Sequence, residues 1–394
     1  MHICQLPISL PRNNSKASGI YIVDLVKELN VNHDTGLVHF NPLRIGFGKD
    51  IKGVNFLYIV DKLIKEQLKY IEKKFVREKF FFNIVQKRDS DIWVKETIAC
   101  FDKYVNKYGT PDVLHCHSSR GAGEAARAIS IKYKIPYILS EHNPIFLNGK
   151  LTKKDKERLE IIYSDAAFVC LVSRKMNRSI KDIVDKTKLK IVPNFISGEF
   201  NYNENRTIKG NNRNITIVGR LDSNKNTRMA VEALRLIKNK IDCNLNIVGE
   251  GDKEGELRNL VKKYNLNDYV TFYGYLSKGE ISSLLNKSDL LFLCSEHESF
   301  GVPVIEALAC GCHVVSTDCS GPVEISEQVE GISIITYNDF ESMATEGMKL
   351  MENLSRNLEY RKNISENAIK KYGKDSVIKL WEDIYKEAIY AFNK

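Results

Sequence analysis

The chain has 394 residues, of which 43% are hydrophobic and 28% charged, a balance that excludes disordered, collagen-like and fibrous proteins. This length predicts two or three domains, each large enough to bury its own core. The net charge of +9 arises in residues 1–200, which hold 34 Lys and Arg against 22 Asp and Glu. Apolar runs are too short for a membrane-spanning helix, the N-terminus lacks the order of a secretory signal, and nine scattered cysteines argue against a disulfide framework. We therefore expect a cytoplasmic protein.

Short apolar runs alternate with helical segments in the first half, which is typical of a parallel sheet built from strand–helix–strand units. We expect six strands there, at 2–6, 55–60, 112–116, 137–139, 168–172 and 190–192. Helices are expected near 19–30, 61–76, 91–108, 121–134 and 153–164. The polar stretch 194–213, rich in Asn and Gly, has the composition of a linker.

A second alternating set follows this linker. Its strands are expected at 215–218, 245–248, 270–273, 290–293 and 313–316, with helices near 225–239, 254–265, 277–287 and 302–310. Segments 339–354 and 356–392 have helical patterns. The pattern predicts an α/β protein with two doubly wound, Rossmann-like domains that face a cleft. Ligands of such folds bind beyond the carboxyl ends of the strands.

The basic stretch 49–88 holds 11 basic and 5 acidic residues. Within 61–82, apolar residues recur at helical spacing with lysines between them. This pattern fits a helix on an anionic membrane surface, and it also fits a domain helix with a solvated lysine face. Nucleic acid is not favoured, because aromatic and basic residues do not form a recognisable binding motif.

The segment 295–311 follows the apolar run LLFLC and leads into a short helix. Such a strand–turn–helix unit directs free backbone N–H groups and the positive end of the helix dipole at the cleft, where a diphosphate could bind. Eight positions at 100° place Glu298 and Glu306 about 80° apart, so both carboxylates could accept hydrogen bonds from the hydroxyls of one ligand. The alternative is a surface turn with two solvated glutamates.

Two cations follow the strand at 215–218. Arg220 comes at its carboxyl end, after Gly219, and Lys225 is expected to open the next helix. An Arg fork and a Lys point charge could neutralise a diphosphate, and Lys in a first helical turn opposes the helix dipole unless an anion is present. The alternative is an ordinary helix start with surface basic residues.

Histidines follow two strands of the first half. We place His115 and His117 on opposite faces of one strand, so that one faces the cleft and the other the core. His142, after the next strand, could bind a substrate hydroxyl or move a proton, or could make a structural hydrogen bond.

Two short motifs have structural explanations. The letters G-x-G-x-x-A at 121–126 suggest a nicotinamide cofactor, but close helix–sheet packing explains the small residues better. Asp89 and Asp91 form a D-x-D sequence before a helical pattern, where helix capping explains them better than metal binding. We predict no metal site.

Taken together, these segments resemble the retaining glycosyltransferases of family 4, which have the two-domain GT-B fold. The resemblance rests on SEH at 140–142, VPN at 192–194, VGRLDSNKNTRMAVEAL, NIVGEGDKEGELRNLV, VTFYGYLSKGEISSLL and HESFGVPVIEALACGCHVVSTDCSGPVEI. It covers nearly the whole chain and is strongest over 214–325. It implies an acceptor-binding domain at 1–195, a nucleotide-sugar domain at 196–372 and, at 373–394, a helix that packs back on the first domain.

The resemblance also implies roles for individual residues. Glu306 would hold the ribose hydroxyls, and Glu298 would contact the donor sugar. Arg220, Lys225 and Glu298 would act in catalysis together with His142. The remaining donor-binding positions are Gly19, Gly219, Tyr275, Leu276, Ser299, Phe300 and Gly301. Gly19 stands where the family has a glycine-rich loop, of which this chain keeps one glycine.

The predicted function is transfer of a hexosyl or N-acetylhexosaminyl group, with retention, from a nucleoside diphosphate sugar, with UDP favoured, and without a metal or other cofactor. The acceptor would be a glycan or a lipid-linked intermediate of bacterial surface polysaccharide, with peripheral binding at the inner face of the membrane through the basic first half. The alternatives are a nucleotide-sugar epimerase or hydrolase with this fold and a non-catalytic adaptor for membranes or polyanions.

Overall fold

The computed structural model describes residues 1–10, 19–45, 69–78, 85–142, 151–203, 205, 212–353 and 356–394, which form two compact units. Unit 1 comprises Met1–Val172, Met176–Val192 and Ile378–Lys394; unit 2 comprises Ser173–Lys175 and Pro193–Val377. The chain leaves unit 1 after Val192, a few residues before the boundary we expected, and returns to it inside the last helix.

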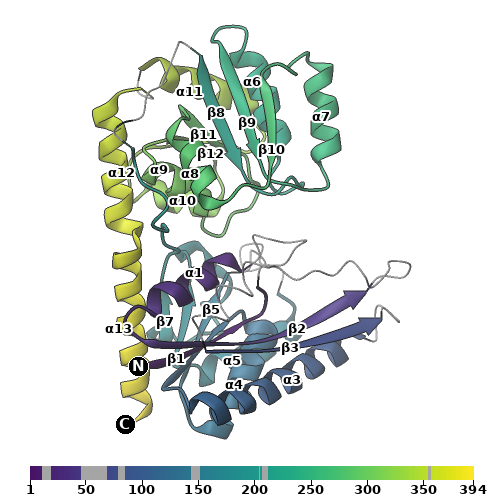
Figure 1. The fold of residues 1–394 in the computed structure, drawn as a ribbon, viewed down its shortest axis with the longest axis vertical. Coiled ribbons are helices and arrows are strands. Elements are labelled where there is room, and N and C mark those ends of the chain that lie inside the picture. Colours follow the sequence, from purple (N-terminus) through teal and green to yellow (C-terminus); the bar gives the residue numbers. More distant parts are fainter. Residues whose placement is uncertain are drawn as a thin grey trace. The chain divides into compact units, whose positions relative to one another are not determined.

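Unit 1 is built on a seven-stranded parallel sheet in the order β3-β2-β1-β4-β5-β6-β7 (Figure 1). The strands are β1 (His2–Pro7), β2 (Asp34–Ile45), β3 (Lys69–Glu78), β4 (Val113–His117), β5 (Tyr137–Glu141), β6 (Phe168–Leu171) and β7 (Leu189–Ile191). The helices are α1 (Ile20–Leu29), α3 (Val85–Tyr108), α4 (Glu124–Tyr133), α5 (Lys153–Asp165) and α13 (Lys374–Phe392). Strands β4, β5 and β6 are buried along their whole length, as expected for a parallel sheet covered on both faces.

Helices cover both faces of this sheet. Tyr21 of α1 and Tyr385 of α13 both lie against the histidines of β4, which places α1 and α13 on one face. On the other face, Gly123 before α4 lies close to Leu139, and the Tyr163 hydroxyl of α5 donates a hydrogen bond to Glu141. Figure 1 shows α3, α4 and α5 along that second face. The last helix of the chain thus packs back on the first domain.

The helix expected over 61–76 is wrong for 69–76, which lie in the strand β3. This strand pairs with β2 from Gly36↔Lys69 to Ile45↔Glu78. The apolar residues in this stretch are Tyr, Ile, Phe and Val, which favour strands, and pairing with a long neighbour outweighs a helical spacing read from few residues. Both helical interpretations of 61–82, a helix on a membrane surface and a domain helix with a solvated lysine face, are therefore wrong for 69–78. Residues 61–68 and 79–82, and the strand expected at 55–60, lie outside the described residues.

Unit 2 is built on a six-stranded parallel sheet in the order β10-β9-β8-β11-β12-β13. The strands are β8 (Arg213–Val218), β9 (Cys243–Val248), β10 (Val270–Gly274), β11 (Leu290–Leu293), β12 (His313–Thr317) and β13 (Ile332–Ile335). The helices are α6 (Thr227–Ile237), α7 (Glu254–Lys263), α8 (Lys278–Asn286), α9 (Val302–Ala309), α10 (Ser320–Ser326), α11 (Phe340–Asn353) and α12 (Leu358–Tyr372). The core on one face joins α6, α7 and α11 to the central strands.

The helix expected over 356–392 is two helices that meet at Gly373, where an added Cβ would lie 2.3 Å from the Ile369 carbonyl oxygen.

Strand order reverses once in each sheet, between β1 and β4 and between β8 and β11. At such a point the chain leaves neighbouring strands in opposite directions, and a crevice opens outside their carboxyl ends. Two segments lie next to each crevice: those after β1 and β4 in unit 1, and those after β8 and β11 in unit 2. Both doubly wound domains that the sequence predicts are thus present, and their reversal points select four loops from the many that follow strands.

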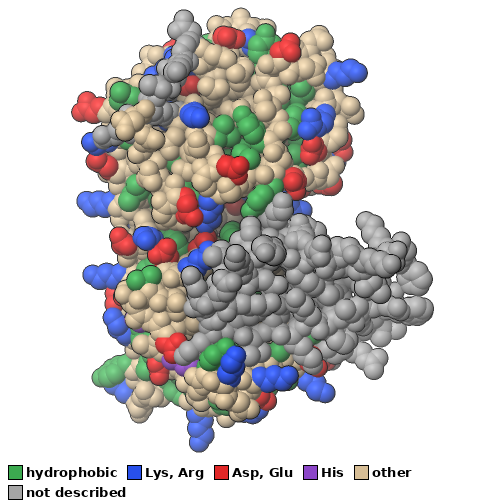
Figure 2. All heavy atoms as spheres, viewed as in Figure 1, with side chains coloured by type: hydrophobic (Ala, Val, Ile, Leu, Met, Phe, Trp, Pro, Cys, Tyr) green, Lys and Arg blue, Asp and Glu red, His purple; other side chains and the backbone are tan. Residues whose placement is uncertain are grey.

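No helix among the described residues is both long and apolar enough to cross a bilayer. On the face drawn in Figure 2, the described Lys and Arg side chains are interspersed with Asp and Glu. Most of the basic stretch 49–88 lies outside the described residues.

Gly249 allows the loops after β8 and β9 to approach closely. Its φ is +132°, and an added Cβ would lie 1.8 Å from the Gly219 carbonyl oxygen. We expect Gly249→Ala to lower the free energy of unfolding by at least ~2 kcal/mol, because the strain of this φ adds to a backbone clash. Gly255→Ala is the control: an added Cβ meets nothing within 4 Å and lies in α7, so it should raise stability by ~0.5–1 kcal/mol. Urea denaturation of both variants measures this; equal stability would contradict the close approach.

Candidate active site

The reversal point of unit 2 brings together a lysine and a glutamate that lie far apart in the sequence. Lys225, after β8, donates a hydrogen bond from Nζ to Glu298 Oε2 at 2.5 Å. The Ser295 hydroxyl, at the end of β11, donates to the same oxygen at 3.4 Å. Both charged side chains are about one-fifth exposed, so the pair reaches solvent while its stems are packed.

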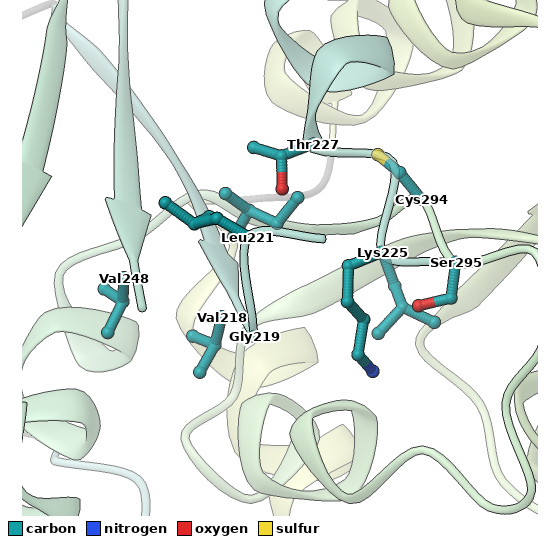
Figure 3. A pocket seen from close by; sticks show the side chains of 10 residues that line it. Val218, Gly219, Leu221, Lys225, Thr227, Val248, Cys294 and Ser295 are labelled. Carbon is teal, nitrogen blue, oxygen red and sulfur yellow. The ribbon is translucent and has the colours of Figure 1, made fainter. Parts of the chain in front are cut away.

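Figure 3 shows Lys225 between the loop that carries Gly219 and the loop that carries Ser295. An added Cβ at Gly219 would lie 3.5 Å from Lys225 Cδ and Cε, so the lysine stem packs across this glycine. The cavity lined by Lys225, Gly219 and Ser295 has a volume of about 10 Å³, close to what one water molecule needs. Packing therefore restricts the aliphatic part of Lys225, and its ammonium group is the part that can bind a ligand.

The Asn224 side chain ties the two loops together. Its Nδ2 donates to the His297 carbonyl oxygen, and its Oδ1 accepts from the His297 N–H, both at 3.1 Å. The Glu296 N–H also donates to the Asn224 carbonyl oxygen at 2.9 Å. These three bonds fix the position of Lys225 relative to Glu298 through the backbone.

The turn after Glu298 leads into α9. Ser299 and Phe300 are buried, and Gly301 caps the helix with a φ of +97°. The Gly321 N–H donates to the Glu298 carbonyl oxygen at 3.0 Å. The first N–H groups of a helix lack intrahelical acceptors, so this turn brings hydrogen-bond donors and the positive helix end to the pair.

The other predicted donor residues of unit 2 follow its strands or lie in α9. Arg220 is 75% exposed and pairs with Asp222 at 3.3 Å, so its guanidinium points to solvent. Glu306 lies in the second turn of α9 and is partly buried. Tyr275 and Leu276 follow β10, whose last residue, Gly274, accepts a hydrogen bond from the Gly249 N–H at 2.8 Å.

Two local expectations for this region are wrong. Lys225 does not open a helix, because Asn226 adopts a left-handed conformation and α6 begins at Thr227. Glu298 precedes α9, so the 80° separation calculated for two helical residues does not apply to Glu298 and Glu306. Asn226, a turn residue with positive φ, starts α6 two residues later than expected, whereas α9 begins at Val302 as expected.

In unit 1, Gly19 caps the N-terminus of α1 beside the reversal point. Its φ is +68°, and an added Cβ would lie 2.3 Å from the Ser9 carbonyl oxygen. Glycine is therefore required where the segment after β1 meets α1. Most of the loop before it, residues 11–18, lies outside the described residues.

His142 lies beside His117 and Tyr21. Its Nε2 is 3.4 Å from His117 Nδ1, and its ring centroid is 4.3 Å from that of Tyr21. Burial lowers the pKa of His142 to about 3, and burial together with neighbouring imidazoles holds the pKa of His117 well below its usual value. Both imidazoles are therefore neutral near pH 7.

The expectation that His115 and His117 point to opposite faces of the strand is wrong. Their ring centroids are 4.2 Å apart, because residues two positions apart on a strand share a face. His115 bonds to the Tyr385 hydroxyl and to the Ser140 hydroxyl, each at 2.7 Å. The two histidines thus belong to one buried polar cluster rather than to a core position and a cleft position.

Glu141 is a buried carboxylic acid next to His142 in the chain. Its Oε1 accepts hydrogen bonds from the Ser119 N–H at 2.8 Å and from the Tyr163 hydroxyl at 3.1 Å, whereas its Oε2 has no hydrogen-bond partner. Burial raises the pKa of Glu141 to about 7 in spite of these two donors. Glu141 therefore changes charge in the neutral range inside the protein.

The structure confirms the packing explanation for one minor motif and contradicts the capping explanation for the other. An added Cβ at Gly123 would lie 2.9 Å from the Leu139 side chain, so the small residues of 121–126 do allow close helix–sheet packing. The capping explanation for Asp89 and Asp91 is wrong, because α3 begins at Val85 and both lie inside it. Among the described residues, no three His, Cys, Asp or Glu side chains are grouped as a metal site would require.

The sequence interpretation overlooked several residues that shape the site: Asn224, Gly249, Gly251, Ser295 and Gly321. The spacing of Gly249 and Gly251 directly after a strand was a usable signal for close backbone approach. Asn224 and Gly321 carry no such signal, because their roles depend on loops that meet only in the folded protein.

Family profiles match most of the chain. The profile described as "Glycosyl transferases group 1" matches residues 199–371, and "Glycosyltransferase Family 4" matches residues 79–200. The N-acetyl-alpha-D-glucosaminyl L-malate synthase of Bacillus anthracis is 25% identical over 292 residues, which cover 71% of this chain and 75% of that enzyme.

Solved structures share the fold of the whole chain. The Anabaena protein Alr3699/HepE, in complex with UDP and glucose, matches with a TM-score of 0.71 at 16% identity and covers 97% of this chain and 98% of its own. S. aureus TarM, in complex with Fondaparinux, alpha-GlcNAc-glycerol and UDP, matches with a TM-score of 0.68 at 14% identity over 98% and 99% of the two chains.

Glu141 makes stability depend on pH in a defined direction. Its pKa rises from 4.5 to about 7 on folding, so the folded state binds the proton more tightly and loses stability as pH rises through this interval. We expect Glu141→Gln to gain roughly 3 kcal/mol relative to the native protein between pH 5 and pH 8, as measured by urea denaturation. Glu124→Gln, which breaks a surface pair with Arg158, is the control. A stability difference that is independent of pH would contradict the raised pKa.

Proposed function

Because the chain belongs to the family 4 glycosyltransferases of the GT-B fold, we propose that it moves a hexosyl or N-acetylhexosaminyl group, with retention, from a uridine diphosphate sugar to a glycan or lipid-linked acceptor. UDP in the complexes of two proteins with the same fold supports this donor. The acceptor class is supported by the glycan and glycoside in one of them.

The observation that carries this proposal is the Lys225–Glu298 pair at the reversal point of unit 2, beside the start of α9. A lysine ammonium has three donors, so it can keep its bond to Glu298 and still bind a diphosphate oxygen. The N–H groups of the turn 299–301 would bind the same diphosphate, and Glu298 would accept hydrogen bonds from the sugar hydroxyls. One ion pair therefore contacts both parts of the donor: Lys225 binds the diphosphate leaving group, and Glu298 binds the sugar.

Arg220 can turn toward a bound diphosphate with little loss of free energy. Its pair with Asp222 is exposed, and such surface pairs contribute only ~0–1 kcal/mol. A diphosphate would offer the guanidinium a bidentate partner that attracts it more strongly than one carboxylate does. We therefore assign Arg220 to the diphosphate, although it points to solvent without one.

In the proposed reaction, the bond between C1 of the sugar and the diphosphate oxygen breaks, and a bond forms between C1 and an acceptor hydroxyl oxygen. The acceptor proton passes to the departing diphosphate on the same face of the sugar, which retains the configuration. Lys225, Arg220 and the start of α9 stabilise the negative charge that develops on the diphosphate. Such electrostatic stabilisation of the transition state is often the largest contribution to catalysis. His142 would orient a hydroxyl, and these positive groups make a divalent metal unnecessary.

The remaining predicted contacts complete the donor site. Glu306 would accept from the ribose hydroxyls, while Tyr275 and Leu276 would lie against the base and Gly219 against the diphosphate. Gly19, in unit 1, would take part in binding the donor, as the resemblance implies. Unit 1 would bind the acceptor, and its excess of positive charge favours an acceptor presented at the inner face of a membrane.

Removing either cation tests the assignment of the leaving-group site. We expect Lys225→Ala and Arg220→Ala each to lower kcat at least tenfold, because losing one such donor typically costs ~2.7–4 kcal/mol of barrier. Lys253→Ala, which removes a surface lysine paired with Glu256, is the control and should keep normal turnover. Near-normal rates in both site variants would refute the assignment.

Thermal-shift measurements with UDP, GDP and ADP test the donor. We expect UDP to raise the melting temperature of the native protein and to lose this effect in Lys225→Ala, since binding stabilises the folded state. Incubation with donor sugars alone should release little product. Rapid turnover without an acceptor would instead indicate an epimerase or hydrolase, and absence of nucleotide binding would indicate a non-catalytic adaptor.

A further inference from the structure

A continuous chain of hydrogen bonds links the last helix to His142. The Tyr385 hydroxyl of α13 accepts a bond from Gln5 Nε2 at 3.3 Å, and Gln5 Oε1 is 2.8 Å from His117 Nε2. His117 Nδ1 in turn is 3.4 Å from His142 Nε2. Gln5, His117 and Tyr385 are at most 1% exposed, so the chain of bonds is shielded from water.

The amide of Gln5 gives this chain a direction. Its oxygen can only accept, so His117 must present an N–H at Nε2. Because burial and the neighbouring imidazoles keep His117 neutral, its Nδ1 then carries a lone pair and accepts from His142 Nε2. A neutral His142 that is protonated at Nε2 carries its own lone pair at Nδ1.

Tyr385 holds the amide in this orientation. Gln5 Nε2 donates to the hydroxyl oxygen at 3.3 Å, which leaves the one hydroxyl proton to be donated to His115 Nδ1, 2.7 Å away. His115 Nε2 lies 2.7 Å from the Ser140 hydroxyl. If the Gln5 amide were reversed, donor and acceptor would exchange in every hydrogen bond of the series, and His142 would carry its proton at Nδ1.

We propose that Gln5, oriented by Tyr385 of the last helix, sets the tautomers of His117 and His142 and is thereby a positioning residue for sugar transfer. This role rests on the proposed function of His142. With its lone pair at Nδ1, His142 accepts a hydrogen bond from a substrate hydroxyl rather than donating one, and it can take up a proton there. The last helix therefore supports the chemistry of the first domain as well as its packing.

Among the described residues, Tyr21 from α1 lies against both His117 and His142, and His115 and the Gln5 amide from β1 lie against His117. Tyr385 from α13 contacts His115 and Gln5. In serine proteases, a partner that imposes the wrong histidine tautomer lowers kcat by ~10⁴, which sets the scale of such an effect. We expect a smaller one here because the amide acts through a second imidazole.

The first test reads the tautomers directly in the full chain labelled with ¹⁵N histidine. Two-bond ¹H–¹⁵N correlation spectra at pH 7 should show His117 and His142 as neutral Nε2–H tautomers, assigned with His142→Asn and His117→Asn. Gln5→Met and Tyr385→Phe should each convert both to Nδ1–H or to a mixture. Glu382→Gln, which removes the negative charge from the bond between α13 and His33 at 2.9 Å, is the matched control and should change nothing. An Nδ1–H or charged His142 in the native protein, or unchanged spectra in Gln5→Met and Tyr385→Phe, would overturn the proposal.

The second test separates positioning from simple packing. Gln5→Met should lower kcat at least tenfold while the KM for the donor stays within twofold; Tyr385→Phe serves if Gln5→Met does not fold. Gln5→Glu keeps an acceptor opposite His117 but adds a negative charge, so the acid limb of its kcat profile should move to higher pH by at least one unit. Unchanged kcat and pH profiles would refute the positioning role even if the tautomers change. If the native protein transfers no sugar, the spectra still decide the tautomers, so the two failures are distinguishable.

Discussion

The reversal of strand order between β8 and β11 is the constraint on which the candidate donor site depends. Parallel strands require crossover connections, and a sheet wound in both directions from its first strand leaves one place where two loops diverge. The loops that diverge here carry Lys225 and Glu298, whose side chains meet at 2.5 Å across this gap. Sheet topology therefore selects which charged residues can act together.

Backbone contacts of small residues then fix these loops. Added Cβ atoms at Gly249, Gly251 and Gly321 would lie 1.8–2.2 Å from carbonyl oxygens of neighbouring loops, so only glycine permits the approach. The side chain of Asn224 adds two hydrogen bonds to the facing loop. A site held by backbone geometry loses little freedom when a ligand binds, which favours electrostatic preorganisation.

Unit 1 uses a different means to place its polar groups. His115 and His117 are buried with lowered pKa values, and uncharged partners on β1, β5 and α13 make hydrogen bonds to them. Buried polar groups that lack partners are costly, so a satisfied network of this kind selects one arrangement of protons. The last helix thus contributes Tyr385 to a network that ends at His142.

Residue order over short distances was enough to predict the alternation of strands and helices, both doubly wound domains, and the segments after strands that hold the charged and imidazole groups. It also identified Arg220, Lys225, Glu298 and His142 as candidates. The folded protein shows in addition that 69–78 pair as a strand with β2, that His115 and His117 share one polar cluster, that Asn224 joins two loops, and that Arg220 points to solvent. These features depend on pairing partners and buried neighbours that lie far apart in the chain, and local periodicity does not encode them.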